Sequence, residues 1–331
     1  MSASMRAPMR AFMLTADGPA LVEAERPRPQ SSEVLVRVRA SALNRADLAL
    51  AGGRPHGALG GVGTPLGLEW AGEVVELGAQ VQGFRAGDRV MCSGAGAFAD
   101  YAVADWRRCF AWPDPQLDWE AGAGLTIALR TAYVAMVMLG QLARGQSVLV
   151  LGASSGVGLM CLQLARERGA GLCIGTSTHA QRRGRLAAFG ADLALDTSEA
   201  PWADQVLAAT GGRGVDLVVD FLSGPVLNAA MRATALGGRI VNVGRLAGEQ
   251  GLFDFELHAL RRIQYLGQTF RTRTAEEVGA IGQQLVAALW PALQAGRLRL
   301  PVDIRLPLAQ ANEALALMRS NAHFGKIVLT P

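Results

Sequence analysis

The sequence predicts an α/β protein in which a β-rich, barrel-like domain is interrupted by a doubly wound parallel sheet. Its 331 residues suffice for two domains, at roughly 150 residues per domain. Short strands and glycine-containing turns fill the first third, and apolar strands then alternate with helices. The chain ends in another apolar strand. We therefore expect residues 1–124 and 271–331 to form one domain, with residues 125–270 inserted as the second.

The first third has the alternation that is typical of half-buried strands. Residues 33–39 alternate apolar and charged side chains, and residues 73–77 and 88–91 form further short strands. Glycine pairs at 52–53 and 60–61 mark turns. This pattern favours a compact antiparallel domain.

The pattern changes near residue 120. Residues 120–142 are rich in alanine and predict a helix. Apolar strands separated by helical stretches are expected at residues 147–151, 171–175, 215–220, 238–243 and 263–266. Such alternation predicts βαβ units and a parallel sheet. Helices are expected at residues 274–295 and 308–318, followed by a strand at 326–329 that pairs back with the first domain.

Composition and charge exclude several classes of protein. Half of the residues are apolar and 18% are charged, which excludes a disordered tail protein, and the composition fits neither a collagen-like repeat nor a small disulfide scaffold. The formal net charge is +4 and no run is rich in Lys and Arg, which argues against nucleic-acid binding. Lys326 is the only lysine among the 32 basic residues.

The cysteines and the N-terminal residues suggest the cell compartment. Cys92, Cys109, Cys161 and Cys173 form no CxxC pair or zinc-finger spacing, so we interpret them as buried or idle thiols in a reducing compartment. The first residues lack the apolar region of a signal peptide, and the true start is Met1, Met5 or Met9. The uncharged run 145–165 contains several glycines and predicts strand, turn and helix rather than a membrane span. We infer a soluble cytoplasmic protein.

A glycine-rich turn is the strongest local signal for a ligand. Residues 148–165 run from an apolar strand through Gly152-Ala-Ser-Ser-Gly-Val-Gly158 into a helix. In this geometry, backbone N–H groups and the positive helix end face a pyrophosphate. The match to GxGxxG is degenerate, with Ala153, Ser155 and Gly158 at the glycine positions, but its context is correct. We expect Ser155, Gly156 and Val157 to contact a dinucleotide; a turn without a ligand is the alternative.

The end of the next strand indicates which dinucleotide is bound. An NAD enzyme usually has an acidic residue there, roughly 20 residues after the glycines, to hold the ribose 2′-hydroxyl. This chain instead has Ser177 and Thr178, with Arg182 and Arg183 following. A guanidinium pairs with a 2′-phosphate, so the pattern favours NADPH. The alternative is that both arginines are solvated helix residues.

At this point the sequence resembles the zinc-free quinone oxidoreductase branch of the medium-chain dehydrogenase/reductase superfamily. The resemblance covers nearly the whole chain and rests on ordered blocks at residues 41–47, 66–73, 83–90, 96–101, 129–133, 152–158, 237–241, 270–273 and 325–329. It implies a GroES-like β-barrel catalytic domain with an inserted Rossmann domain.

The resemblance also implies that no metal is bound. Zinc-dependent relatives carry Cys at the position of Asn44 and His at the position of Leu68, and this chain has no four-cysteine lobe for structural zinc. Without a Lewis acid, alcohol oxidation loses the group that stabilises its alkoxide. A quinone or an enone, by contrast, accepts hydride directly, since the resulting oxyanion is delocalised.

The family suggests site residues by position. Asn44 is expected beside the nicotinamide, where it orients the ring amide or donates to a substrate oxygen. Arg271 and Arg273 are expected to bind a carbonyl oxygen or a cofactor phosphate, or else to be solvated cations. Further cofactor-binding positions are Thr131, Gly244, Phe270, Asn321 and Lys326. Asp47 has a structural reading, as a helix cap or turn residue.

Two departures from the family pattern concern the substrate pocket and the adenine site. Quinone-active relatives often have a Tyr after the Asn-x-x-Asp block, where this chain has Ala49 and Pro55. A Tyr that stacks on adenine is replaced by Asp196-Thr197. His56 is a candidate proton donor, but it also fits a solvated loop residue.

Three functions remain open at this stage. The first is NADPH-dependent reduction of quinones; the second is reduction of α,β-unsaturated carbonyls by an enoyl or enone reductase, for instance in natural-product assembly. The third is an NADPH-binding protein with little catalysis, acting as a structural, sensor or RNA-binding protein. Family analogy also suggests a homodimer that pairs around residues 263–270.

Overall fold

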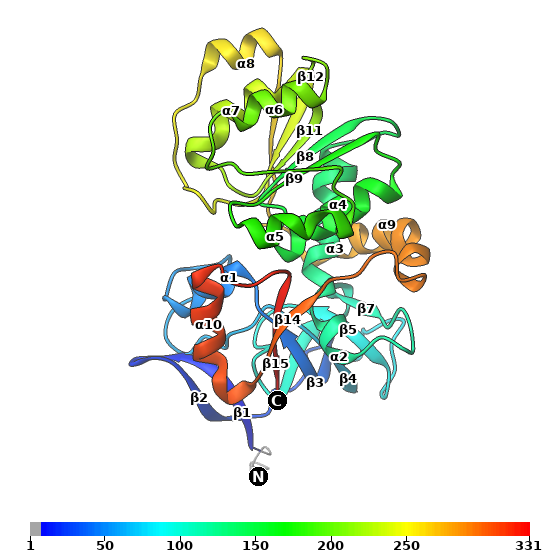
Figure 1. Cartoon of the computed structure of the whole chain (residues 1–331). Helices are drawn as coiled ribbons and strands as arrows, with labels where there is room; N and C mark the ends of the chain where they lie inside the picture. Colours follow the sequence, from blue (N-terminus) through cyan, green and yellow to red (C-terminus); the bar gives the residue numbers. More distant parts are fainter. Residues whose placement is uncertain (1–7) are drawn as a thin grey trace, which may run out of the picture. The chain divides into compact units, whose positions relative to one another are not determined.

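The structure, a computed structural model, describes residues 8–331 (Figure 1). Met1 and Met5, two of the candidate start residues, lie outside the described residues. Contacts divide the chain into two units. Unit 1 contains residues up to Ile127 together with Phe270–Gln294 and Arg299–Pro331, and unit 2 contains Ala128–Thr269 and Ala295–Leu298.

Unit 1 is built on a mixed β-sheet. Its strand order is β14-β15-β3-β4-β5-β7, with β6 also paired to β3. The bounds are β3 Glu33–Ala42, β4 Glu69–Leu77, β5 Arg89–Ser93, β6 Tyr101–Asp105, β7 Cys109–Ala111, β14 Val302–Pro307 and β15 Lys326–Thr330. The predicted strands at 33–39, 73–77 and 88–91 are confirmed, and β4 begins four residues earlier than predicted, at Glu69. The C-terminal strand β15 pairs antiparallel with β3, as expected from the sequence.

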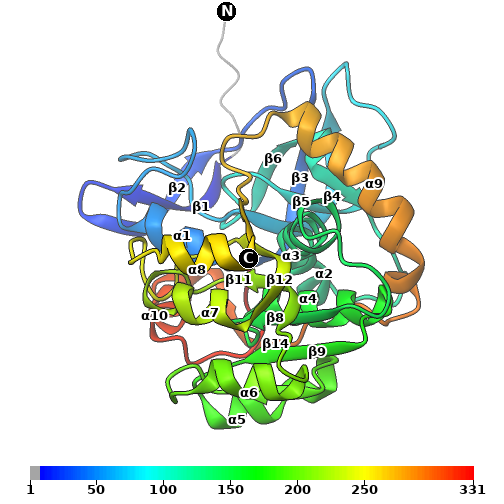
Figure 2. The same ribbon diagram turned by 90° about the horizontal axis from the view of Figure 1, so that it is seen from above.

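A hairpin and several helices complete unit 1. Strands β1 (Pro8–Thr15) and β2 (Gly18–Glu25) form the hairpin, which the sequence analysis did not anticipate. The helices are α1 Arg45–Ala51, α2 Trp119–Ala123, α9 Ala275–Gln294 and α10 Ala311–Ser320, with short 3-10 turns at Trp106–Arg108 and Leu308–Gln310. Figure 2 shows α9 as one long helix, and its Trp290 ring lies 5.5 Å from the ring of Phe110 on β7.

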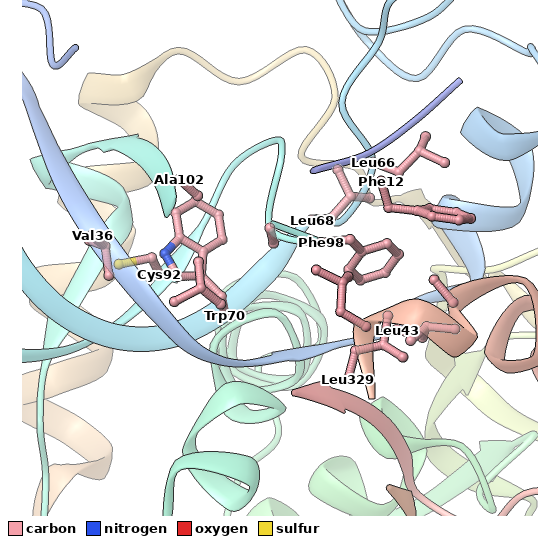
Figure 3. Packing of buried hydrophobic residues seen from close by; sticks show 14 of the residues in the cluster. Phe12, Val36, Leu43, Leu66, Leu68, Trp70, Cys92, Phe98, Ala102 and Leu329 are labelled. Carbon is pink, nitrogen blue, oxygen red and sulfur yellow. The ribbon is translucent and has the colours of Figure 1, made fainter. Parts of the chain in front are cut away.

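The core of unit 1 gathers residues from distant parts of the chain (Figure 3). Phe12 of β1, Phe98 and Leu329 of β15 are fully or almost fully buried within it. Trp70 of β4 is also buried there. Because neighbouring residues of a strand point to opposite faces, Glu69 faces away from this cluster.

Unit 2 is a parallel sheet of six strands in the order β10-β9-β8-β11-β12-β13. The bounds are β8 Ser147–Leu151, β9 Leu172–Thr176, β10 Leu193–Leu195, β11 Val215–Asp220, β12 Thr234–Asn242 and β13 Gln264–Gly267. The first three strands run outward from β8 in one direction and the next three in the other, which is the doubly wound arrangement. The predicted strands are confirmed to within a few residues, and β10 was missed.

Helices connect the strands of unit 2. They are α4 Gly156–Glu167, α5 Ala180–Gly184, α6 Trp202–Ala209, α7 Leu227–Ala233 and α8 Phe255–Arg261, with 3-10 turns at Leu186–Phe189 and Gly224–Val226. The uncharged run 145–165 folds as strand, turn and helix, as expected. Among the described residues, no helix is both long and apolar enough to cross a membrane.

The single helix expected at residues 120–142 is interrupted. It divides into α2, α3 (Leu125–Tyr133) and a π-helical segment, Val134–Leu139. The break falls at Gly124, which caps α2. A Cβ at Gly124 would lie 2.9 Å from Cε of Lys326, so a glycine leaves room for the lysine stem.

Gly72 allows β3 and β4 to approach, and it yields the first prediction. A Cβ at this position would lie 2.1 Å from the carbonyl oxygen of Arg37 on β3. We expect Gly72→Ala to lower the free energy of unfolding by about 3 kcal/mol, because the two strands must separate. The control is Gly267→Ala in β13, where an added Cβ meets no atom within 4 Å. Equal urea midpoints for the two variants would contradict this reasoning.

Candidate functional site

The glycine-rich turn of unit 2 lies between β8 and α4. Gly152 has φ +79°, a conformation that favours glycine, and its N–H donates to Oγ1 of Thr176. Ser155 is the N-cap of α4: its Oγ accepts from the N–H of Gly158 at 3.1 Å and donates to the carbonyl of Gly152 at 3.0 Å. Gly156 and Val157 form the first turn of α4. The N–H groups and the positive end of a helix in this position can receive an anion.

Close packing around this turn fits a bound dinucleotide. A Cβ at Gly158 would lie 2.7 Å from Cα of Ala153, so the helix approaches the strand as closely as its backbone permits. A Cβ at Gly175 on β9 would lie 3.1 Å from Cβ of Ala153. The turn lies at the carboxyl end of β8, between β9 and β11, where the strand order of a doubly wound sheet reverses and ligands bind.

The end of β9 has the hydroxyl residues and arginines that the sequence indicated. Ser177 is buried and its Oγ donates to Oγ of Ser154 at 3.2 Å, whereas Thr178 is exposed. Arg182 and Arg183 lie in α5 and are partly exposed. This segment can therefore present a guanidinium and hydroxyls to a phosphate.

Arg183 has a carboxylate partner that the sequence analysis did not weigh. Its Nη1 lies 2.7 Å from Oδ2 of Asp196 and donates to the carbonyl of Ser177 at 2.9 Å. Burial alone would raise the pKa of Asp196, but hydrogen bonds from Ser198 and the charge of Arg183 outweigh it, so its pKa lies below the ordinary value. Asp196 and the Ser177 carbonyl therefore hold the Arg183 guanidinium at the end of β9.

The two other predicted cofactor positions of unit 2 lie elsewhere in it. The carbonyl of Thr131, in α3, accepts from Nε2 of Gln268 at 3.0 Å. Gly244 follows β12, and its carbonyl accepts from Oγ of Ser223 at 2.7 Å. A Cβ at Gly244 would lie 2.7 Å from the carbonyl oxygen of Phe221, so this position also requires glycine.

In unit 1 the structure brings Asn44 and Lys326 together around a buried carboxylate, Glu69. The Lys326 ammonium forms an ion pair with Oε1 of Glu69, and their side chains are 5% and 0% exposed. Nζ of Lys326 also donates to Oδ1 of Asn44 at 3.1 Å, and Nδ2 of Asn44 donates to Oε1 of Glu69 at 3.0 Å. Oε2 of Glu69 accepts from the N–H of Ile127 at 2.9 Å. The side chains of Asn44, Glu69 and Lys326 are therefore each held in place by the other two.

Asn44 is more constrained than the sequence suggested. Besides Glu69, its Nδ2 has a second acceptor, the carbonyl of Ala42 at 3.4 Å. Both amide hydrogens and the amide oxygen therefore have partners within unit 1. Asn44 is also the N-cap residue of α1.

The structure confirms the predicted role of Asp47 as a helix-capping residue. Its Oδ2 accepts from the backbone N–H of Asn44 at 2.7 Å, which caps α1. The carboxyl is fully buried, and burial raises its pKa to about 7, with a further contribution from the neighbouring charge of Glu69. Asp47 thus fixes the backbone from which Asn44 projects.

The remaining predicted residues of unit 1 form two small groups. Oδ1 of Asn321, the left-handed cap of α10, accepts from Nη2 of Arg45. The guanidinium of Arg273 lies 5.5 Å from the ring centre of Phe270. Arg271 is exposed, and its backbone packs close to Gly57. A Cβ at Gly57 would lie 3.8 Å from the backbone carbonyl carbon of Arg271. Burial, with a smaller effect of Arg271, lowers the pKa of His56, which disfavours its charged form.

The residues of the buried cluster do not fit a zinc site. Asn44 and Leu68 supply neither thiolate nor imidazole, and the remaining carboxylate, Glu69, is neutralised by an ammonium. Among residues 8–331, no group of three or more His, Cys, Asp and Glu side chains has metal-binding geometry.

The sequence did not predict Glu69 and Asp196, which form ion pairs with the candidate residues Lys326 and Arg183. Glu69 lies in the quoted block 66–73, where a carboxylate at the start of an apolar strand requires a buried partner. Lys326, the only lysine of the chain, was the available signal. Asp196 was noted solely as the residue in place of a tyrosine.

Comparison with known proteins identifies the family. Residues 30–114 match the alcohol dehydrogenase GroES-like domain, and residues 189–329 match the family described as zinc-binding dehydrogenase. The hybrid PKS-NRPS synthetase pyvA of Aspergillus violaceofuscus is 31% identical over 304 residues, which is 90% of this chain and 8% of that protein. The chain spans 8% to 14% of the length of the first curated relatives, most of them polyketide synthases.

Solved structures extend the similarity to the whole chain. An NAD-dependent alcohol dehydrogenase is 28% identical with a TM-score of 0.85, covering 97% of this chain and 99% of the other. A mycobacterial protein solved with NADPH is 26% identical, also with a TM-score of 0.85, covering 98% and 100%. The chain belongs to the medium-chain dehydrogenase/reductase superfamily.

The buried ion pair gives a prediction about stability. Lys326→Met leaves the Glu69 carboxylate buried without its cation, so we expect it to lower the free energy of unfolding by about 3–5 kcal/mol. Lys326→Met combined with Glu69→Gln removes both charges and should recover most of that loss. Urea unfolding of the wild type, both single variants and the double variant measures the coupling. Strictly additive losses would contradict the pairing.

Asp47 gives a prediction about pH. Its pKa is raised to about 7 in the folded chain, so the folded state binds this proton more tightly than the unfolded state does. Stability from this group is therefore fully present below about pH 4 and is lost as pH rises to about 7, by about 4 kcal/mol at most. Asp47→Asn should flatten this part of the pH profile of urea midpoints. Exposed Asp17→Asn is the control and should leave it unchanged.

Proposed function

We propose that this chain is a zinc-independent, NADPH-dependent oxidoreductase that transfers hydride to a conjugated carbonyl acceptor. The observation that carries the proposal is the Lys326–Glu69 ion pair. A protein cation neutralises the carboxylate that is hydrogen-bonded to Asn44, one of the two positions where zinc-dependent relatives have ligands. The other position, Leu68, packs in the apolar core of unit 1. An acceptor whose oxyanion is delocalised fits such a site, because it needs no Lewis acid.

The residues of this chain supply binding and positioning. When bound, NADPH provides the hydride. The first turn of α4 would hold its pyrophosphate, and Arg182 its 2′-phosphate. Asn44 acts as a positioning residue, since both its amide hydrogens already have acceptors. Arg271 and Arg273 are then the better candidates to hold the acceptor oxygen, where a guanidinium would stabilise developing negative charge.

Two acceptor classes remain, and each has support. Quinones are the first candidate, from the resemblance of the sequence blocks to the quinone oxidoreductase branch. Enoyl or enone substrates are favoured by the similarity to polyketide synthases and by Ala49 and Pro55 in place of a tyrosine. An enone also requires a proton at Cα after hydride reaches Cβ, whereas a quinone does not form a new C–H bond.

The deciding experiment follows absorbance of reduced cofactor with a panel of quinones and enones. The proposal predicts turnover of at least one panel member with NADPH. Turnover of enones alone, with a new C–H bond seen by NMR, assigns the second class. Tight NADPH binding without turnover of any acceptor would instead support a binding protein with little catalysis and overturn the proposal.

We also propose that the chain forms a homodimer, in which the edge strands of the unit 2 sheets of two copies pair with each other. Strand β13 is the edge strand, and its neighbourhood exposes large apolar side chains: Leu252, Phe255 and Leu260 are 86%, 77% and 67% exposed. Exposed apolar residues beside an unpaired strand are suited to pairing with a copy of the same strand. Light scattering of the purified chain gives the mass in solution.

Cofactor choice yields a prediction on Arg182. We expect Arg182→Ala to raise the KM for NADPH about 10-fold or more, because a charge-assisted contact to the 2′-phosphate is lost. The KM for NADH, which lacks this phosphate, should change little. Arg185→Ala, in the exposed residue after α5, is the matched control. Equal use of NADH and NADPH by the wild type would contradict the assignment.

A further inference from the structure

Two of the cysteines lie side by side in unit 1. Sγ of Cys92, on β5, is 3.3 Å from Sγ of Cys109, on β7. Both are buried and neither is in a disulfide, and they are directly opposite each other in the antiparallel register of the two strands. They lie 17 positions apart in the sequence, a spacing that does not predict a pair.

The position in the ladder suits a covalent link. The N–H of Trp112 donates to the carbonyl of Arg89, which makes Arg89 and Trp112 a hydrogen-bonded pair. Pairs alternate along an antiparallel ladder, so Met91 and Phe110 are the next hydrogen-bonded pair, and Cys92 and Cys109 form a narrow, non-hydrogen-bonded pair. Narrow pairs have Cα atoms about 4.5 Å apart, within the range that disulfides span.

The two thiols differ in access. Cys92 is completely buried and lies beside Trp70 and Val36 in the core (Figure 3). Cys109 is 7% exposed and lies on β7, which ends the sheet order. A small oxidant therefore meets Cys109 first, with Cys92 in place behind it.

The other two cysteines provide an internal comparison. Cys161 of α4 and Cys173 of β9 belong to unit 2 and are completely buried. Burial raises the pKa of both thiols, that of Cys173 to about 11. Since the thiolate is the reactive form, these two should react slowly.

We propose that Cys92 and Cys109 form a reversible intrachain disulfide when the protein meets a peroxide. The Cys109 thiolate attacks one oxygen of hydrogen peroxide, the O–O bond breaks, and hydroxide leaves as Cys109 becomes a sulfenic acid. The sulfur of Cys92 then attacks the Cys109 sulfur, the S–O bond breaks, and water is released. In total, two thiols and one peroxide give one disulfide and two waters, and a thiol reductant reverses the oxidation.

The link would stabilise a segment next to the buried ion pair. It closes the chain between β5 and β7, which contains β6 and Phe98 of the core. Ser93, the residue after Cys92, is paired with Glu69 in the register of β4 and β5. Oxidation would thus fix the strand beside Glu69 without changing any member of the Lys326 cluster.

The test is a peptide map of the full chain after treatment with hydrogen peroxide. Free thiols are alkylated under denaturing conditions, and tryptic peptides are analysed without reduction. The disulfide joins peptide 90–107 to peptide 109–130, while Cys161 and Cys173 remain alkylated. The thiol count falls from four to two. Closing such a loop should raise the melting temperature by about 5 °C or more.

Matched variants keep the test decisive. Cys109→Ala should keep all its thiols and show no rise in melting temperature, whereas Cys173→Ala should form the link as the wild type does. If Cys109→Ala fails to fold, Cys92→Ala takes its place. The peptide map of the wild type tests the link without either variant. Four alkylated cysteines after peroxide treatment, or links that involve Cys161 or Cys173, would overturn the proposal.

Discussion

The buried ion pair between Lys326 and Glu69 is the interaction that holds the candidate site of unit 1 together. Two charges removed from water are costly unless each has its partner and hydrogen bonds, and here Asn44 and the N–H of Ile127 supply them. Together with Asn44, the pair joins three distant parts of the sequence: the start of β4, the residue before α1 and the start of β15. Gly124, where the helix predicted at 120–142 breaks, leaves room for the lysine stem.

This centre changes the role of Asn44. Position alone suggested an amide that donates to substrate or cofactor, but the structure gives both of its hydrogens to Glu69 and Ala42. The carboxyl of Asp47, whose pKa is raised, accepts a hydrogen bond from the backbone N–H of Asn44 at the start of α1. We therefore propose that the cluster is a support with a fixed cation, and that Arg271 and Arg273 contact the acceptor.

The sequence predicted the parallel sheet well because its strands are continuous apolar runs between helices, as at residues 147–151 and 215–220. It missed the β1–β2 hairpin and β10, whose side chains are largely half-buried and lack a clear period. In the candidate site, Ser155 and the glycines follow from local backbone geometry. The Arg183–Asp196, Glu69–Lys326 and Cys92–Cys109 contacts depend on how distant segments pair, which no local pattern contains.

We propose that Lys326 takes the place of a metal beside Asn44. It is tested most directly by measuring NADPH oxidation by a conjugated acceptor before and after exhaustive chelation, with the metal content of the same samples determined. We expect an unchanged rate and zinc far below one ion per chain. One zinc per chain, with activity lost on its removal and restored on its return, would contradict it.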